Sequence, residues 1–330
     1  MDIENRIRTR AYFKWLERPA KGPPSELDDW LAAEREELAL DLIDAATEAV
    51  LPDPSFTQDD AWYGSDRIAN LFGLLKRRVR KRRTRSYMLS LIDDYQDYLT
   101  SSAAVSDVEA NRQASNALRI YRIVASLKVL VGDSFARTAT HTLRKELKDL
   151  FAEDQTAFET AEFNMYSAAA IQSQTGLLVS FIDDGDETAP DLQVDDLAYV
   201  ECKDIQTTNR ENIEKALSDH LAKAHDQLAA AQRRRRLAGT GVCIDVPWTT
   251  LPLTPAEWSV IRQALSGIDA PQFVLVSSSG INPSKEVVGF PVAVCLVWSE
   301  SGAPLFEPLL RRMTRHSYRM RPDGFEPISH

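Results

Sequence analysis

The sequence has few of the features that mark secreted, membrane-spanning or disulfide-stabilised proteins. It contains only 3 cysteines, and no two of them have the C-x-x-C spacing of a zinc or redox site. Cys202, Cys243 and Cys295 fall within apolar stretches, so we expect buried thiols in a reducing compartment. No run of about eighteen apolar residues occurs, and the charged N-terminal residues lack the apolar core of a signal peptide. We therefore expect a cytoplasmic protein that does not associate with a membrane.

Common enzyme signatures are missing as well. There is no Walker A loop and no Gly-x-Ser-x-Gly nucleophile elbow. Gly239 and Gly241 match only the start of a dinucleotide-binding loop, and residues 242–246 have the pattern of a strand. His220 and His225 are spaced so that one helix face cannot present both to a metal, and we interpret them as surface residues. These absences direct attention to the carboxylates.

The net charge of −10 is distributed unevenly along the chain. Residues 1–60 contain 7 Lys and Arg against 15 Asp and Glu, a net charge of −8. Residues 61–90 contain 9 against 1, a net charge of +8, and most of that excess lies between Lys76 and Arg85. A second basic cluster runs from Arg233 to Arg236. A local positive field attracts phosphate whatever the total charge, so we expect these clusters to contact a nucleic-acid backbone.

This prediction assigns nucleic-acid contacts to nine basic residues: Lys76, Arg77, Arg78, Arg80, Lys81, Arg82, Arg83, Arg233 and Arg234. Two other interpretations of the block at 76–85 stay open. In the first, the block is a solvated helix face. In the second, it pairs with the acidic N-terminal residues of the same chain. Such pairing would make the block autoinhibitory or simply structural.

Proline, glycine and hydrophobic periodicity divide the chain into three predicted parts. Residues 1–50 have the pattern of two helices with a break at residues 19–24 and an N-cap at Ser25, which predicts a small acidic unit. Residues 51–150 follow a Pro-rich link and are predicted to be helical, with interruptions near 100–106 and near Gly132. Residues 151–330 alternate helix and strand patterns, which predicts an α/β or α+β domain with a mixed sheet and flanking helices.

Within the first part, residues 10–15 (RAYFKW) and 29–34 (DWLAAE) resemble a small bacterial domain of unknown function that recurs at the ends of unrelated proteins. The resemblance is confined to this short stretch and implies no activity.

In the third part, the pattern predicts helices over residues 155–174 and 210–236. Strands are expected near residues 177–182, 190–194, 197–203, 241–246, 272–277 and 288–298. The basic tail at 311–330 has no regular apolar spacing, so we expect it to be loosely ordered.

The predicted strands between residues 190 and 203 bring acidic and basic groups together. Glu201 and Lys203 are two residues apart on a strand, so their side chains point to the same face. If a three-residue loop at 195–197 joins the strands, Asp191 lies directly opposite Glu201, at about 5 Å. A two-residue loop would put the two carboxylates on opposite faces. In the first geometry they can share one divalent cation.

This arrangement resembles the restriction endonuclease-like superfamily, whose signature is written PD-(D/E)xK. The matching residues are Pro190-Asp191 and Glu201-Cys202-Lys203, set within a helix-strand-strand-strand-helix order over residues 155–300. The resemblance implies a restriction endonuclease-like mixed sheet, metal-dependent phosphodiester hydrolysis and an acid on the preceding helix. Glu159 and Glu162 share a face of that helix, and we favour Glu162.

The resemblance also suggests roles for these residues. Asp191, Glu201 and the Cys202 carbonyl are expected to bind Mg²⁺ or Mn²⁺. Lys203 is expected to position or help deprotonate the attacking water, and Glu162 to recruit a second ion or order a metal-bound water. Polar residues on or near the following helix, namely Asn209, Asn212 and Gln227, either contact substrate or are solvated.

The sequence thus favours a Mg²⁺-dependent endodeoxyribonuclease, acting in restriction, phage defence or repair. Cutting both strands of a duplex needs two sites, which favours a homodimer. The structural alternative for Asp191, Glu201 and Lys203 is an ordinary ion pair on an exposed hairpin. The functional alternatives are a non-catalytic nucleic-acid-binding or scaffolding protein on the same fold, and a ribonuclease.

Overall fold

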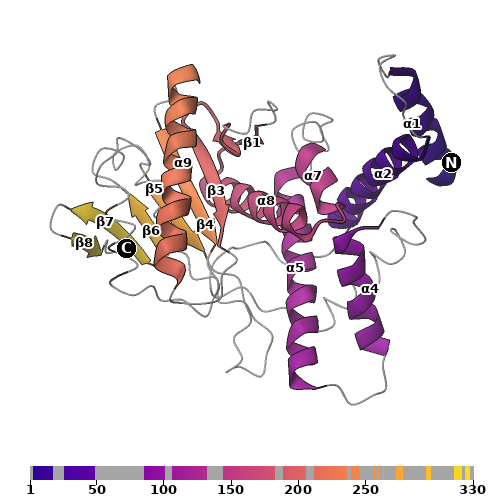
Figure 1. Ribbon diagram of the computed structural model, residues 1–330, viewed down its shortest axis with the longest axis horizontal. Coiled ribbons are helices and arrows are strands. Elements are labelled where there is room, and N and C mark those ends of the chain that lie inside the picture. The colour runs from indigo at the N-terminus through magenta and orange to yellow at the C-terminus, as the bar shows by residue number, and fades with distance from the viewer. Residues whose placement is uncertain are drawn as a thin grey trace. The chain divides into compact units, whose positions relative to one another are not determined.

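The computed structural model describes much of the chain up to residue 245 and separate segments beyond it (Figure 1). The described residues are 3–17, 26–48, 85–100, 106–131, 144–182, 189–205, 212–235, 239–245, 256, 259, 263, 273–277, 295–298, 316–321 and 324–327. The chain separates into two compact units. Unit 1 comprises Met1–Leu51, Gly64–Ala136 and Arg144–Glu162, and unit 2 comprises Pro52–Tyr63, Arg137–Leu143 and Phe163–His330.

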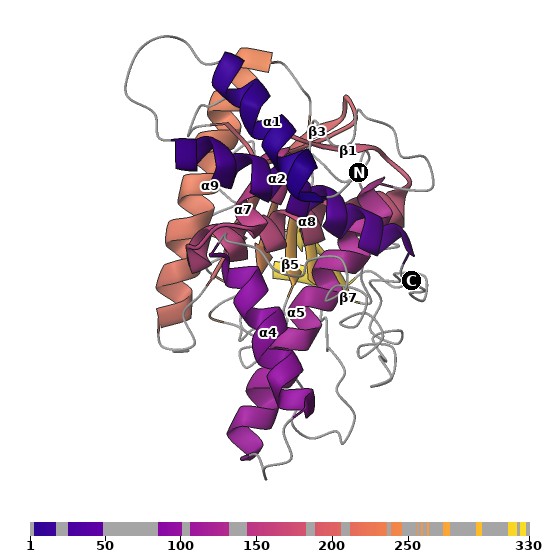
Figure 2. The ribbon, with the colours of Figure 1, turned by 90° about the vertical axis from the view of Figure 1, so that its right-hand side faces the viewer.

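Unit 1 is helical, as the sequence predicts for the N-terminal half. Its described helices are α1 (Ile3–Glu17), α2 (Glu26–Glu48), α4 (Tyr87–Thr100), α5 (Asp107–Val131), α7 (Arg144–Leu150) and the first part of α8 (Gln155–Thr175). Helix α2 packs on α1, α5 and α7, and α4 lies beside α5 in both views (Figures 1 and 2). The two predicted N-terminal helices are present as α1 and α2, whereas the predicted break at residues 19–24 and the predicted N-cap Ser25 lie outside the described residues.

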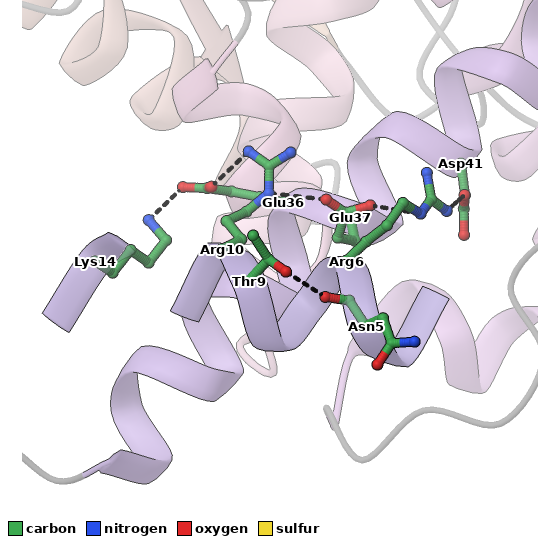
Figure 3. Close-up of polar contacts among 8 residues, drawn as sticks. All are labelled: Asn5, Arg6, Thr9, Arg10, Lys14, Glu36, Glu37 and Asp41. Atoms are coloured by element: carbon green, nitrogen blue, oxygen red, sulfur yellow. Dashed lines mark hydrogen bonds and ion pairs between the residues drawn. The ribbon is translucent and has the colours of Figure 1, made fainter. Parts of the chain in front are cut away.

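Helices α1 and α2 are joined by a ladder of ion pairs (Figure 3). Three basic residues spaced four apart on α1 face three acids on α2: Arg6, Arg10 and Lys14 against Glu36, Glu37 and Asp41. The Arg10 Nε to Glu37 Oε1 distance is 2.8 Å, and the Glu37 side chain is 3% exposed. Some of the acidic charge near the N-terminus is therefore neutralised inside unit 1.

Unit 2 is built on a mixed sheet in the strand order β1 to β8. The strands are β1 (Val179–Phe181), β2 (Leu192–Val194), β3 (Ala198–Asp204), β4 (Gly239–Asp245), β5 (Phe273–Ser277), β6 (Cys295–Trp298), β7 (His316–Arg321) and β8 (Gly324–Pro327). Strands β3, β4 and β5 are parallel neighbours, while β1, β2 and β3 pair antiparallel. The predicted α+β class, a helical half followed by a mixed sheet with flanking helices, is confirmed.

Helix α9 (Ile213–Arg235) makes the crossover from β3 to β4 and packs on both strands (Figure 1). Its apolar stripe of Ile213, Leu217, Leu221, Ala224 and Leu228 is fully buried. A parallel neighbour requires such a connection, because the chain must return to the same end of the sheet. The second part of α8, from Phe163 to Ile171, is buried at every position. The predicted helices at 155–174 and 210–236 are thus confirmed.

The prediction of a loosely ordered C-terminal tail is wrong. Strands β7 and β8 pair antiparallel, with Tyr318 opposite Pro327 and Arg321 opposite Gly324. Tyr318, Met320 and Phe325 are the apolar residues of this hairpin, and they recur with the period of two that suits a strand. The alternation is weak in the sequence, because arginines lie between and beside these few apolar residues.

Candidate nuclease-like site

The hairpin of β2 and β3 has the predicted register. Leu192 pairs with Val200 and Val194 with Ala198, which leaves a three-residue loop at 195–197. The next step of the same register places Asp191 opposite Glu201. Asp195 opens the loop with a φ of 42°, a left-handed conformation that Asp tolerates better than most residues. The Leu197 N–H closes it by donating to the Val194 carbonyl at 3.0 Å.

The Asp191 carboxylate is held by two donors in unit 2. Its Oδ2 accepts a hydrogen bond from the Cys202 N–H at 2.8 Å, and its Oδ1 lies 3.4 Å from Nδ2 of Asn164 on α8. The Asp191 carbonyl accepts from the Ile182 N–H at 3.0 Å. The backbone and the side chain of the partly exposed Asp191 are therefore both anchored, with the carboxylate held against β3.

Glu201 is the most buried acid of this hairpin, with 1% of its surface exposed. Burial raises the pKa of its carboxyl to about 8; the Asp191 charge adds to the rise and Lys203 opposes it. Its Oε1 accepts from Lys203, but its Oε2 is buried and faces no hydrogen-bond donor. The predicted alternative of an exposed hairpin with an ordinary ion pair therefore does not describe this residue.

Lys203 connects Glu201 to helix α9. Its ammonium donates to the Glu201 carboxylate and, at 2.9 Å, to Oε1 of Gln227. The prediction that Glu201 and Lys203 share a face is confirmed. Gln227 was expected to contact substrate or solvent, but the structure places it against Lys203, where it fixes the ammonium beside the carboxylates. Asn212 is exposed at the start of α9, and Asn209 lies outside the described residues.

Glu162, the favoured helix acid, lies in an arginine cluster of unit 1. Its Oε2 accepts from Arg119 Nε at 2.8 Å and its Oε1 from Arg122 Nη2 at 2.8 Å, both from α5. Arg119 also pairs with Glu159 at 3.0 Å and lies over the Phe158 ring. Both oxygens of the fully buried Glu162 carboxylate are thus taken by guanidinium groups.

Residues two apart on a helix do not share a face, which explains why Glu162 and Asn164 have different partners. Glu162 faces the arginines of α5, and Asn164 faces Asp191. Asn164 is not among the predicted site residues, because nothing in the spacing of α8 distinguishes it from the acids nearby. An asparagine in a stretch from Phe163 to Ile171 that is apolar apart from Ser167 is the signal that could have found it.

Most of the predicted basic residues lie outside the described part of the chain. This applies to Lys76, Arg77, Arg78, Arg80, Lys81, Arg82 and Arg83. Arg233 is exposed near the end of α9, where its Nε donates to the Ala229 carbonyl at 3.1 Å. Arg234 continues the same helix, and its side chain is outside the described residues.

His220 is less exposed than expected for a surface histidine. Its Nδ1 is buried and has no hydrogen-bond partner, and it lies on the same face of α9 as Gln227, two turns away. Burial lowers its pKa, and the positive charge of Lys203 adds to this effect. A neutral imidazole therefore lies on the face of α9 whose Gln227 contacts Lys203.

Cys202 and Cys243 are register partners on β3 and β4, and both are buried and free. Burial raises the pKa of the Cys202 thiol, and the neighbouring Cys243 raises it further. Protonated, inaccessible thiols agree with the predicted core role. The Cys295 side chain is outside the described residues.

The donor set at the hairpin suits a hard divalent cation. Asp191 and Glu201 supply carboxylate oxygens, and the buried Oε2 of Glu201, which faces no donor, is the position where a cation would compensate charge. Across the described ranges, however, no group of three or more His, Cys, Asp or Glu side chains is placed to hold a metal. A cation here would depend on two carboxylates with neutral oxygens, such as the Cys202 carbonyl, and water.

Comparison with known proteins finds a family match for the N-terminal segment only. Residues 2–38 match the model of a family described as "Protein of unknown function (DUF2934)", which agrees with the predicted resemblance of this stretch to a small domain of unknown function. The match covers α1 and most of α2. No curated protein and no solved structure matches the chain. Within the described residues, no helix is long and apolar enough to span a membrane.

Proposed function

We propose that the protein is a metal-dependent nuclease that hydrolyses DNA phosphodiester bonds at the β2–β3 hairpin. The observation that carries the proposal is the opposed pair of carboxyl groups, the partly exposed Asp191 and the buried Glu201, with Lys203 held against Glu201. Burying the Glu201 carboxyl beside a second acid costs solvation, and groups whose pKa is strongly shifted in this way cluster where chemistry is done.

The surrounding topology supports the same conclusion. A helix, three antiparallel strands, a second helix and a parallel strand follow in the order α8, β1, β2, β3, α9, β4. This is the order on which the resemblance to PD-(D/E)xK nucleases was based, and it brings Gln227 from α9 to the same ammonium.

Asp191 and Glu201 would hold Mg²⁺ or Mn²⁺, together with the Cys202 carbonyl. When bound, such a cation supplies Lewis-acid polarisation of a phosphate oxygen and lowers the pKa of coordinated water. Glu162 is not part of this site in our proposal, because both of its oxygens are paired with Arg119 and Arg122.

Lys203 would act on the phosphate and the attacking water. Gln227 and Glu201 restrain its ammonium, so a positive charge is already in place when negative charge develops on the phosphate oxygens. His220 carries a lowered pKa and would remain neutral near pH 7, adding no competing charge to this face. Arg233, Arg234 and the basic residues at 76–83 would contact the phosphate backbone without reading sequence.

A second candidate function is non-catalytic nucleic-acid binding or scaffolding on the same fold. The observation that favours it is the engagement of Glu162 by two arginines, which leaves two carboxylates at the hairpin. A ribonuclease would use the same site and chemistry as the main proposal but would cleave RNA instead of DNA.

The Lys203→Met variant distinguishes the two candidates. Methionine keeps the length of the stem and removes the charge, so we expect cleavage of plasmid DNA with Mg²⁺ to fall by about 100-fold or more. DNA affinity should stay within about threefold, because one of many phosphate contacts changes. Lys223→Met, at an exposed position of α9, serves as the control. Wild-type rates in Lys203→Met would remove the residue from the mechanism.

A further inference from the structure

Asn164 is a polar residue in an apolar setting. It lies on α8 within unit 2, it is 3% exposed, and its neighbours along the helix from Phe163 to Ile171 are buried. An asparagine in such a position loses helix propensity and solvation without a gain in packing. Among the described residues its side chain bonds Asp191, from Nδ2 to Oδ1 at 3.4 Å, which is a long and weak hydrogen bond. This contact alone does not offset the free-energy cost of burying the amide.

Two buried oxygens near Asp191 face no hydrogen-bond donor. They are Oδ1 of Asn164, whose amide contacts the Asp191 carboxylate, and Oε2 of Glu201, whose carboxyl interacts with the same Asp191. Buried acceptors are nearly always satisfied in folded proteins, so each exception calls for a cause. Both residues interact with Asp191, so a positively charged ligand held at that carboxylate would give both oxygens a partner once the Asn164 amide turns its oxygen toward Asp191.

We infer that Asn164 supplies a neutral side-chain oxygen to the divalent cation of this site, as the third side-chain ligand beside Asp191 and Glu201; the inference rests on the proposed function. Amide carbonyls are ordinary ligands of hard cations. A half-turn of the terminal amide exchanges Nδ2 and Oδ1, so the group that donates to Asp191 in the free protein presents its oxygen instead when the cation binds. The 3.4 Å between Asn164 and Asp191 is near the separation of about 3 Å between adjacent oxygens around Mg²⁺.

The competing explanation is that Asn164 only positions Asp191 by its hydrogen bond. The two roles differ in what a carboxylate at position 164 would do. A third carboxylate ligand raises affinity for the cation, because charge on the ligands sets affinity at such sites. As a mere neighbour, a carboxylate would lose the hydrogen bond and repel Asp191, so affinity would fall.

The experiment is titration of the full-length protein with Mn²⁺ alone, followed by the electron paramagnetic resonance signal of free Mn²⁺. We expect Asn164→Leu, which is close in shape, to bind Mn²⁺ about tenfold or more weakly. Asn164→Asp is expected to bind at least about threefold more tightly than wild type. Glu201→Gln reports on the site itself, and Asn5→Leu, at an exposed position of α1, is the control.

The outcomes separate this inference from the proposed function. If wild type binds Mn²⁺, Glu201→Gln does not, and Asn164→Leu binds within twofold of wild type, the assignment of Asn164 is overturned and the site remains. Weaker binding by both Asn164 variants would reduce Asn164 to a positioning residue and overturn its role as ligand. If wild type has no Mn²⁺ binding that depends on Glu201, the proposed site fails and the inference fails with it. Should Asn164→Leu not fold, the direction of change in Asn164→Asp decides alone.

Discussion

At the scale of single residues, the Glu201 carboxyl connects burial to chemistry. It is held under the hairpin with 1% exposure, its pKa is raised to about 8, and one of its oxygens faces no donor. A structural acid would be paired on both oxygens, as Glu162 is with Arg119 and Arg122. Glu162 thus holds helices together, whereas Glu201 keeps one carboxylate oxygen available to a ligand.

The raised pKa of Glu201 predicts a pH dependence of stability in the metal-free protein. Below pH 4.5 the carboxyl is protonated in both states, and between 4.5 and about 8 only the folded chain keeps the proton. The folded state then binds more protons, so the contribution of this group to stability falls as pH rises through that window and is constant above it. In EDTA, Glu201→Gln should therefore gain in Tm over wild type as pH rises from 4.5 to 8. Parallel Tm curves for the two proteins would contradict the shift.

The Glu162 cluster predicts a large cost for removing one arginine. Arg122 is 10% exposed and its partner is fully buried, so Arg122→Met leaves a buried carboxylate with one guanidinium instead of two. We expect a loss of about 2–4 kcal/mol in the free energy of unfolding, measured by urea denaturation. Arg112→Met is the matched control, because Arg112 is 56% exposed and pairs with Glu109. Its cost should be below about 0.5 kcal/mol, and equal costs would show that burial is not the cause.

At the scale of elements, the length of the β2–β3 loop decides whether the site exists. Side chains alternate along a strand, so a one-residue change of register turns a carboxylate to the other face. The three-residue loop at 195–197 keeps Asp191 and Glu201 on one face, with Asp195 accepting the left-handed conformation that the turn requires.

Deleting Asp196 should therefore disrupt the site while changing no predicted functional residue. Asp196 is exposed, and its removal shortens the loop to two residues. Mn²⁺ binding is expected to fall by about tenfold or more, whereas Asp196→Gly, which keeps the loop length, should bind as wild type. Retention of full affinity in the deletion variant would show that Asp191 does not need to oppose Glu201.

The same scale shows what the sequence could and could not predict. Helices α8 and α9 and the hairpin register followed from periodicity and loop length, because these are local properties of the chain. The partners of Glu162 did not follow, because Arg119 and Arg122 lie about 40 residues away and reach it only through packing of α5 on α8. Asn164 was missed for a similar reason, since its contact with Asp191 spans a helix and a strand.

At the scale of the whole molecule, the described structure consists of a helical unit and a sheet unit with different roles in our account. Unit 1 carries the short segment that matches a family of unknown function, and its α1–α2 ladder neutralises several N-terminal acids. The proposed chemistry lies in unit 2, whose sheet, α8 residues and α9 supply Asp191, Glu201, Lys203, Gln227 and Asn164. A net charge of −10 is compatible with DNA binding only if the basic residues are grouped.

The central claim is most directly tested by cleavage of supercoiled and linear DNA with Mg²⁺, with Mn²⁺ and with EDTA. Wild type and Glu201→Gln are compared, with Glu214→Gln as a control at an exposed position of α9. We predict cleavage by wild type and Glu214→Gln that requires the metal, and its loss in Glu201→Gln. Absence of cleavage by wild type in all conditions, or equal cleavage by Glu201→Gln, would contradict the assignment of a nuclease site to this hairpin.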